Sequence, residues 1–279
     1  MILIADSGST KCSWALCNEK GEIINRYHTA GFNPKFNTYD SILKEMNESS
    51  LSDIKEMVTE VYFYGAGCST EKKNKVIFDP LNSFFNIDKI YIRHDLEAAL
   101  KATYKGVPII SCILGTGSNS CIFNGTTIFE NAPSLGYILG DEGSGNFFGK
   151  KLVNLYVNNI LSESIVEKFE NWTNEKKEDI IENIYSLQRP NLYLATFFRF
   201  MYENKEEEIF DNIFRNGIQY FFDLHIKCFE NYKDYPLTFV GSVAYYLSDY
   251  INEVAQKEGM KIQEIISSPI ENLVKEHFE

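Results

Sequence analysis

The chain has 279 residues, of which 44% are hydrophobic and 14% aromatic, enough to bury a substantial core in one large or two medium domains. Its formal net charge of −12 excludes the broadly basic surface that nucleic acids and anionic membranes attract, so we expect neither as a partner. No apolar stretch of about 18 residues occurs, and the N-terminal run MILIADSG is short and carries no basic segment, so neither a membrane span nor a signal peptide is expected.

The cysteines indicate the compartment. They lie mostly in apolar runs without a CxxC pair, and histidine is scarce, which argues against a zinc site. We therefore expect buried, reduced thiols in a cytoplasmic protein. The six cysteines are Cys12, Cys17, Cys68, Cys112, Cys121 and Cys228.

The first third of the chain predicts strands that give way to alternating helices and strands, a pattern typical of a mixed α/β sheet covered by helices. Short turns rich in Gly, Ser and Asn separate the first three strands. In chain order, we expect strands at 2–6, 12–18 and 22–31, a helix over 38–50, a strand at 60–67, a helix over 70–86, a strand at 89–94 and a helix over 95–106.

From residue 108 the same order begins again, with a long helical region inserted. The pattern predicts a first domain over 1–106 and a second over 107–279, with the last helix a candidate for packing back on the first domain. The expected elements are strands at 108–115, 118–125 and 126–133, helices over about 145–235, a strand at 236–241, a helix over 242–259, a strand at 260–266 and a short helix after Pro269.

The second half repeats a motif of the first. A shift of 109 positions places Ser7-Gly8-Ser9 over Thr116-Gly117-Ser118, and Cys12 over Cys121. Both copies are a strand, a turn of small residues with a central glycine, and a second strand. This repetition predicts that the fold is duplicated.

Hairpins made of Gly, Ser and Thr can come close to a ligand, because no bulky side chain stands in the way. Their backbone N–H groups and hydroxyls form a concave site that suits phosphate. Either turn alone is better explained as an ordinary β-turn. A facing pair, with Asp6 at the end of the first strand, favours a clamp for a triphosphate.

Three ordered segments carry a resemblance to a known superfamily. ADSGSTK (5–11), LGTGSNS (114–120) and FVGSVA (239–244) resemble the two phosphate motifs and the adenosine motif of the actin-like ATPases, which include sugar kinases, actin and heat-shock chaperones. Within that superfamily, GYILGDEGSG (136–145) looks like the signature of the BadF/BadG/BcrA/BcrD group. That group contains N-acetylglucosamine kinases and the activators of 2-hydroxyacyl-CoA dehydratases.

This resemblance implies a duplicated ribonuclease H-like fold, with two lobes and ATP in the cleft between them. Asp6 would hold Mg²⁺, mostly through water, near the β- and γ-phosphates. Gly241 and Ser242 would lie beside the adenine or the ribose. The residues expected to line the phosphates are Ser7, Gly8, Ser9, Thr10, Lys11, Thr116, Gly117 and Ser118.

Asp95, which follows the strand at 89–94, has two compatible interpretations. It can cap the helix that begins there. Alternatively, it is a general base that takes the proton of an attacking hydroxyl, because kinases of the superfamily carry an aspartate at a comparable place. If only one carboxylate oxygen caps the helix, the other is free for the reaction.

The sugar contacts also follow from the resemblance. In N-acetylglucosamine kinases a segment similar to LGDEGS contacts sugar hydroxyls, which implies such contacts for Asp141, as hydroxyl acceptor, with Glu142 beside it. An asparagine near the position of Asn33 binds sugar in the same enzymes. Gly67 ends a strand at the same edge and lets the backbone approach the substrate. A plain turn is the alternative for each segment.

We therefore expect an ATP-dependent sugar kinase of the N-acetylglucosamine kinase type, with ATP and Mg²⁺ as cofactors. The alternative is an ATP-hydrolysing activator of a partner enzyme, like the dehydratase activators. Those hold an iron–sulfur cluster on a cysteine-bearing loop, and no pair of cysteines here resembles that loop. The sequence leaves open which sugar is used and whether the protein is a homodimer.

Overall fold

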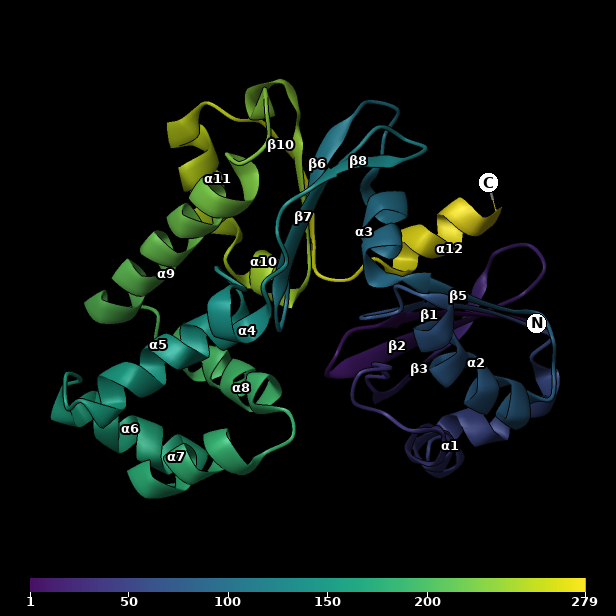
Figure 1. The fold of residues 1–279 in the computed structure, drawn as a ribbon, viewed down its shortest axis with the longest axis horizontal. Coiled ribbons are helices and arrows are strands. Elements are labelled where there is room, and N and C mark those ends of the chain that lie inside the picture. Colours follow the sequence, from purple (N-terminus) through teal and green to yellow (C-terminus); the bar gives the residue numbers. More distant parts are fainter. Residues whose placement is uncertain (279) are drawn as a thin grey trace. The chain divides into compact units, whose positions relative to one another are not determined.

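A computed structural model describes residues 1–278. The chain folds into two compact units (Figure 1). The N-terminal unit is Met1–Lys105 together with the segment that begins at Ser268, and the C-terminal unit is Gly106–Ser267.

The N-terminal unit is built on a five-stranded sheet in the order β3-β2-β1-β4-β5, in which β1 runs antiparallel to β2 and parallel to β4. The strands are β1 (Ile2–Ser7), β2 (Lys11–Cys17), β3 (Ile23–Ala30), β4 (Glu60–Gly65) and β5 (Ile90–His94). The helices are α1 (Tyr39–Glu48), α2 (Glu71–Phe85), α3 (Asp95–Thr103) and α12 (Ile270–Phe278), with 3₁₀ turns at Ser50–Asp53 and Lys55–Met57.

Helices cover both faces of this sheet, because strand β1 buries side chains on both sides. Leu3 and Ala5 pack in one cluster with residues of α1 and α2. Ile4 points the opposite way and packs with Ala98 of α3 and Leu273 of α12. A strand buried on both faces has a continuous apolar sequence rather than an alternating one, as ILIA does.

Helix α12 returns to the N-terminal unit after the chain has passed through the other unit. It packs against α3, β1 and β2, and α3 and α12 lie side by side in Figure 1. The Asn272 side-chain amide donates to the carbonyl of Ala102 at 2.8 Å, near the end of α3. The His277 ring lies 2.9 Å from the Tyr64 hydroxyl, and burial lowers the pKa of His277 to about 4.

The C-terminal unit has a second five-stranded sheet, in the order β10-β9-β6-β7-β8. Its strands are β6 (Ile109–Leu114), β7 (Ser118–Phe123), β8 (Ile128–Asn131), β9 (Leu237–Val240) and β10 (Ile262–Ile266). Its helices are α4 (Gly136–Leu139), α5 (Gly145–Val157), α6 (Glu163–Thr173), α7 (Lys177–Ser186), α8 (Pro190–Glu203), α9 (Glu208–Phe221), α10 (Ser242–Tyr246) and α11 (Ser248–Glu258), with a π-helical turn at Phe222–Ile226 and a 3₁₀ turn at Tyr232–Asp234.

The two sheets have the same strand order and the same parallel and antiparallel pairs, which confirms the predicted duplication. The predicted register of the repeat is wrong, however. The matching six-residue strands begin at Ile2 and Ile109, a shift of 107 rather than 109. Gly8 therefore corresponds to Gly115, the first residue after the second strand of the pair, and not to Gly117.

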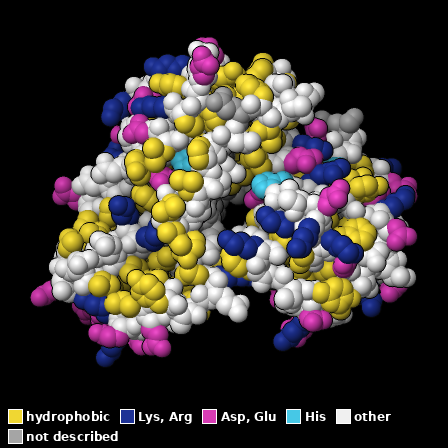
Figure 2. Space-filling model, viewed as in Figure 1, with side chains coloured by type: hydrophobic (Ala, Val, Ile, Leu, Met, Phe, Trp, Pro, Cys, Tyr) yellow, Lys and Arg dark blue, Asp and Glu magenta, His cyan; other side chains and the backbone are white. Residues whose placement is uncertain are grey.

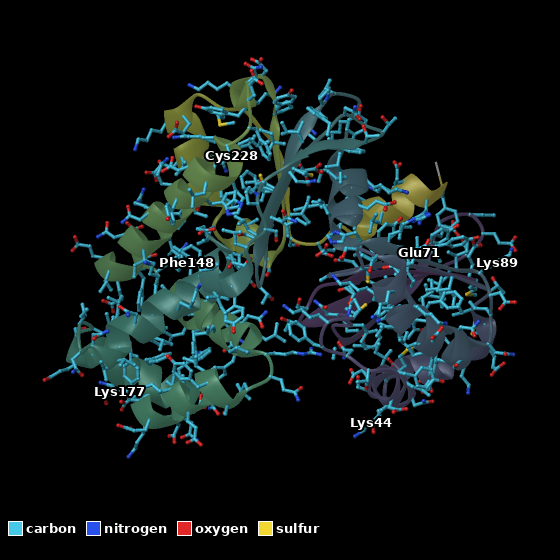
Figure 3. The ribbon with its side chains drawn as sticks, in the orientation of Figure 1. Lys44, Glu71, Lys89, Phe148, Lys177 and Cys228 are labelled. Atoms are coloured by element: carbon cyan, nitrogen blue, oxygen red, sulfur yellow. The ribbon has the colours of Figure 1, made fainter. Side chains whose placement is uncertain are left out.

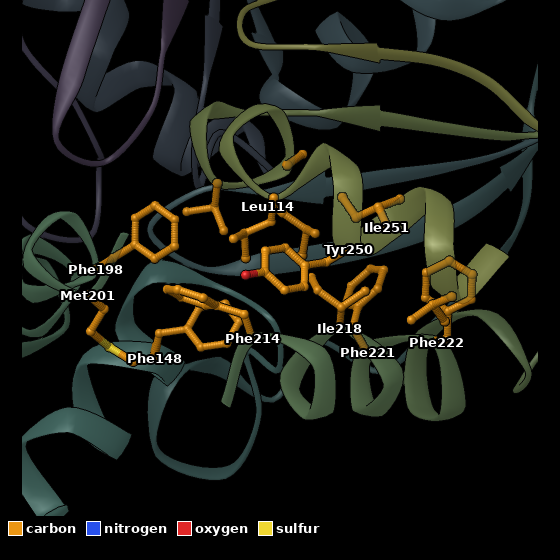
Figure 4. Close-up of a cluster of buried hydrophobic side chains, with 14 of the residues drawn as sticks. Leu114, Phe148, Phe198, Met201, Phe214, Ile218, Phe221, Phe222, Tyr250 and Ile251 are labelled. Atoms are coloured by element: carbon orange, nitrogen blue, oxygen red, sulfur yellow. The ribbon is translucent and has the colours of Figure 1, made fainter. Parts of the chain in front are cut away.

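The core of the C-terminal unit is aromatic. Phe148 of α5 packs edge-on against Phe214 of α9, with ring centroids 5.1 Å apart. Figure 4 shows side chains from β6, α5, α8, α9 and α11 meeting in this cluster. Buried aromatic rings of this kind supply large apolar areas and favour such edge-to-face pairs. Phe148 is also labelled in Figure 3, inside the helical part of the unit.

Two further details differ from the predicted elements. The helix expected over 242–259 is interrupted at Leu247, which separates α10 from α11. The short helix α4 was not predicted. It lies in GYIL, at the start of the GYILGDEGSG segment.

Five of the six cysteines are buried, and Cys228 is exposed (Figure 3). Hydrophobic side chains also reach the surface, as Figure 2 shows. Ile138 and Leu139 of α4 are among the exposed ones. No helix within residues 1–278 has the length and apolar character needed to span a membrane.

Gly149 sets the close approach of α5 to α8. A Cβ atom at this position would lie 1.9 Å from the backbone oxygen of Leu194. We predict that Gly149→Ala lowers the free energy of unfolding by about 1–3 kcal/mol, because the helices must move apart and the helix-propensity gain of alanine is smaller. Urea unfolding followed by circular dichroism measures this. Asn154→Ala, on the exposed side of α5, is the control and should change stability by less than about 0.5 kcal/mol.

Candidate functional site

The carboxyl ends of three parallel strands meet at one edge of the N-terminal sheet. Ser7 of β1 pairs with Gly65 of β4, which pairs with His94 of β5. Asp6 is next to Ser7, and Asp95 is next to His94. Two strand spacings separate β1 from β5, so the two aspartate backbones lie roughly 10 Å apart at this edge. In open α/β sheets this edge is where ligands bind.

Asp6 is a poorly solvated carboxylate. Burial, and secondarily the negative charge of Asp95, raise the pKa of Asp6 to about 7. The Ser268 hydroxyl donates to Oδ2 of Asp6 at 3.4 Å. Ser268 is the first residue of the segment that returns to the N-terminal unit. Asp6 therefore depends on a residue 262 positions away in the sequence.

Asp95 is the first residue of α3, and the N-cap residue is His94, so the interpretation of Asp95 as the N-cap is wrong by one residue. One carboxylate oxygen, Oδ1, lies 2.9 Å from both the Leu96 backbone nitrogen and Nδ1 of His94. The hydrogen bond to Asp95 raises the pKa of His94. No residue within 1–278 hydrogen-bonds to Oδ2 of Asp95, so this oxygen is available to a substrate hydroxyl.

The first hairpin, Gly8-Ser9-Thr10, connects β1 to β2. The Gly8 N–H donates to the Lys11 carbonyl at 3.0 Å, and the Gly31 N–H donates to the Thr10 carbonyl at 3.0 Å. The backbone of Gly31 packs closely against the hairpin, since a Cβ atom on Gly31 would be 2.2 Å from the Gly8 carbonyl oxygen. Lys11 is exposed at the start of β2.

Ser7 is fully buried and serves the fold. Its hydroxyl oxygen accepts from the Phe32 N–H at 2.9 Å, which fixes the segment after Gly31 against the end of β1. The structure therefore places Ser7 next to the hairpin, with its side chain directed toward Phe32.

Asn33 and Gly67, predicted as sugar contacts, lie together in the structure. Gly67 has a φ of +81°, and a Cβ atom on it would be 2.8 Å from Oδ1 of Asn33. The Asn33 side-chain amide donates to the Ser9 hydroxyl at 3.3 Å. Both candidate sugar residues thus contact each other, and Asn33 contacts the first hairpin.

The second hairpin, Gly115-Thr116-Gly117, is held by the start of α5. The Gly145 N–H donates to the Gly115 carbonyl at 2.8 Å, and the Asn146 N–H donates to the Thr116 carbonyl at 3.1 Å. The Asn146 side-chain amide donates to the same Thr116 carbonyl at 2.6 Å. Ser144 is the N-cap of α5, and its hydroxyl accepts from the Phe147 N–H.

Asp141 is bound to this hairpin. Its Oδ1 accepts from the Ser118 N–H at 3.4 Å, and its Oδ2 accepts from the Asn146 amide at 2.8 Å. A Cβ atom on Gly117 would lie 3.0 Å from Oδ2, so a larger residue would push the carboxylate slightly away. Asp141 has a φ of +61°, a left-handed conformation that is rare outside glycine and asparagine.

Glu142 points to a different partner. Its Oε2 lies 2.9 Å from Nε2 of His225, and both residues are buried. Glu142 also lines a pocket of about 400 Å³ with Gly140 and residues of α4 and α5. The neighbouring acids Asp141 and Glu142 therefore have separate surroundings.

Gly241 lies against the second hairpin from the other side. It has a φ of +124°, and a Cβ atom on it would be 2.3 Å from the Leu114 carbonyl oxygen. Ser242 is exposed and begins α10. The predicted adenosine motif and the second phosphate motif are thus in direct contact.

Sequence reasoning missed four residues of these sites: Gly31, Asn146, His225 and Ser268. Asn146 follows the GDEGS segment directly, so its proximity to the motif was a usable signal. His225 and Ser268 carry no local signal, because their partners Glu142 and Asp6 are distant in the sequence.

Comparison with solved structures identifies a relative along the full chain. A protein from Porphyromonas gingivalis, provisionally named N-acetylglucosamine kinase, is 33% identical to this chain with a TM-score of 0.91, and the alignment covers 100% of this chain and 99% of that one.

Two more distant structures share the fold. A Chromobacterium violaceum protein with the same provisional name has a TM-score of 0.72 at 13% identity, covering 99% of this chain and 98% of that one. A ROK family glucokinase from Streptomyces griseus, solved with glucose and AMPPNP, has a TM-score of 0.54 at 15% identity, covering 98% and 97%.

No protein-family model matches the sequence, and no curated protein matches it. The full-length relationship to the Porphyromonas protein is nevertheless decisive for the family. The chain belongs to the same family as that protein, the N-acetylglucosamine kinase-like proteins, and has the actin-like ATPase fold.

Proposed function

We propose that this protein is an ATP-dependent sugar kinase, and that its acceptor is an amino sugar of the N-acetylglucosamine type. The reaction moves the γ-phosphoryl group of ATP to a sugar hydroxyl and releases ADP. The observation that carries the proposal is the strand register that brings Asp6 and Asp95 to one sheet edge in a chain of this family.

The two hairpins support the use of ATP. Each follows the first strand of its sheet and is made of small residues, so its backbone is accessible to phosphate oxygens. We assign Gly8, Ser9, Thr10 and Lys11 of the first hairpin, and Thr116, Gly117 and Ser118 of the second, to the phosphates. Gly241 and Ser242 are assigned to the nucleoside.

Asp6 fits a magnesium ion. Its carboxylate is partly buried and near a second acid, and the resulting rise of its pKa is the signature of a group that lacks a compensating positive charge. No cluster of three or more acidic, histidine or cysteine ligands occurs in the described chain. Mg²⁺ matches this, because it binds through one or two carboxylates, water and substrate phosphates. When bound, the ion neutralises charge on the phosphates.

Asp95 is assigned as the general base. Its Oδ1 is committed to the Leu96 N–H and to His94, which orients the carboxylate. Oδ2 then accepts the proton of the sugar hydroxyl while the new O–P bond forms and the bond from the γ-phosphorus to ADP breaks. Asn33, Gly67 and Glu142 are assigned to the sugar.

The family assignment alone does not fix the acceptor, so a panel of sugars is the direct test. We predict that N-acetylglucosamine stimulates ADP release by at least about tenfold over water, because a bound hydroxyl is a better positioned nucleophile. ADP release is measured with amino sugars, hexoses and muramic-type sugars. If no sugar stimulates release, the kinase proposal is wrong and an ATP-hydrolysing activator becomes the better explanation.

Asp95→Asn keeps the size of the side chain and removes the base. We predict a loss of kcat of about 100-fold or more, with ATP binding nearly unchanged, since Asp95 acts on the acceptor. Assays of ADP release measure kcat, and calorimetry measures ATP binding. Glu97→Gln, a partly buried acid on the same helix that pairs with Arg93, is the matched control and should keep a kcat close to that of wild type. Normal turnover of Asp95→Asn would exclude this residue as the base.

The raised pKa of Asp6 also predicts a pH effect on stability without Mg²⁺. The folded protein keeps the Asp6 proton up to about pH 7, whereas the unfolded chain loses it near the ordinary pKa of 3.8. Asp6 therefore destabilises the fold increasingly as the pH rises from 4, and the full effect is reached above pH 7. Asp6→Asn should therefore gain stability over wild type as pH rises.

We expect this advantage to grow by about 1–3 kcal/mol between pH 5 and pH 8.5, measured by urea unfolding in a chelating buffer. Added Mg²⁺ should reduce it. Glu19→Gln, in an exposed turn, is the control. An advantage that is the same at both pH values would contradict the assigned state of Asp6.

A further inference from the structure

The adjacent acids Asp141 and Glu142 differ in how many of their oxygens the protein itself occupies. Both oxygens of Asp141 are engaged, by the Ser118 N–H and by the Asn146 amide. Glu142 uses only Oε2, which contacts His225. Oε1 has no hydrogen-bond partner within residues 1–278. Of the two acids, Glu142 therefore has a carboxylate oxygen that no protein donor occupies, which leaves it fully available to a substrate hydroxyl.

His225 is held in place from three sides. It lies in the π-helical turn that follows α9, where the Lys227 N–H donates to the Phe222 carbonyl at 2.9 Å. The Ser120 hydroxyl of β7 donates to the His225 carbonyl at 2.5 Å. The Phe221 ring stacks on the imidazole, with centroids 4.9 Å apart and planes 14° apart. Single π-helical turns of this kind occur frequently at functional sites.

The contacts of the imidazole indicate its tautomer. Nδ1 is buried and has no partner among the described residues, whereas Nε2 lies 2.9 Å from Oε2 of Glu142. A ring with its proton on Nε2 donates to the carboxylate and leaves only a lone pair unsatisfied at Nδ1. The opposite tautomer would face the carboxylate with a lone pair and bury an unpaired N–H, which costs more. His225 is thus a hydrogen-bond donor to Glu142.

We propose that His225 is a positioning residue for the acceptor sugar: it holds Oε2 of Glu142 so that Oε1 accepts a sugar hydroxyl. This inference rests on the proposed kinase function and deepens it. Asp141, by contrast, joins the GDEG segment to the second hairpin through the Ser118 N–H and the Asn146 amide. The specificity for the acceptor sugar thus depends on His225, which lies 83 positions from Glu142, the residue that contacts the sugar.

The test compares two substitutions of His225. His225→Phe keeps an aromatic ring that can stack on Phe221 but removes the donor, whereas the amide of His225→Gln can reach the same oxygen of Glu142. We expect His225→Phe to raise the KM for N-acetylglucosamine about tenfold or more, while the KM for ATP stays within about twofold. His225→Gln should restore the sugar KM to within about threefold of wild type. His28→Gln, on an exposed strand, is the matched control.

A double substitution protects the test against misfolding. His225→Phe leaves a buried carboxylate without its donor, and Glu142→Gln with His225→Phe removes that charge. If His225 acts through Glu142, the sugar KM of the double variant equals that of Glu142→Gln alone. Thermal melts identify the variants that are folded.

The outcomes separate the two proposals. If the wild type turns over sugar and His225→Phe leaves the sugar KM unchanged, or raises both KM values equally, the role of His225 is wrong while the kinase function stands. The proposed role of His225 is also wrong if His225→Gln does not restore the sugar KM, or if the effects of the two substitutions on the sugar KM add in the double variant. If calorimetry finds that wild-type protein binds no sugar of the panel, the kinase proposal fails, and this inference with it.

Discussion

The parallel pairing of β1 with β4 and of β4 with β5 is the constraint on which the N-terminal site depends. It aligns Ser7, Gly65 and His94 across the sheet. Asp6, which precedes Ser7, and Asp95, which follows His94, therefore lie at the same edge. Burial of Asp6 at this edge, and secondarily the negative charge of Asp95, raise the pKa of Asp6 to about 7. The chemistry of the edge follows from strand register.

The C-terminal unit repeats the topology but uses its corresponding edge differently. Where the first sheet has Asp6, the second has Ile113 at the shift of 107, and no acid enters from the strand itself. Its acids come from the GDEG segment, and Asn146 attaches Asp141 to the hairpin. Duplication supplied two similar hairpins, and the carboxylates were then placed by different elements.

Local sequence patterns predicted most of the elements, because strand runs such as ILIA and helix spacings such as that of α1 are short-range features. They also predicted the duplication and the order of its motifs. The register of the repeat was missed, since Gly117 matches Gly8 by residue type while the strand bounds align Gly8 with Gly115. Residue identity in a glycine-rich turn is a weak guide to position.

Side-chain partners were the least predictable level. Nothing near His225 indicates that it contacts Glu142, and nothing near Ser268 indicates a contact with Asp6. These pairs exist because the chain returns to earlier elements, and only the packed structure specifies them. The site residues that came from motifs were recoverable, whereas those that support them from a distance were not.

The path of the chain has a consequence for biosynthesis. The C-terminal unit is one continuous stretch, Gly106–Ser267, whereas the N-terminal unit needs the segment that begins at Ser268. On the ribosome, the sheet made first must therefore wait for its covering helix α12 until the whole second unit has emerged. During that interval the apolar face that receives Leu273 is uncovered, so this half of the molecule exposes apolar surface for longer than the other.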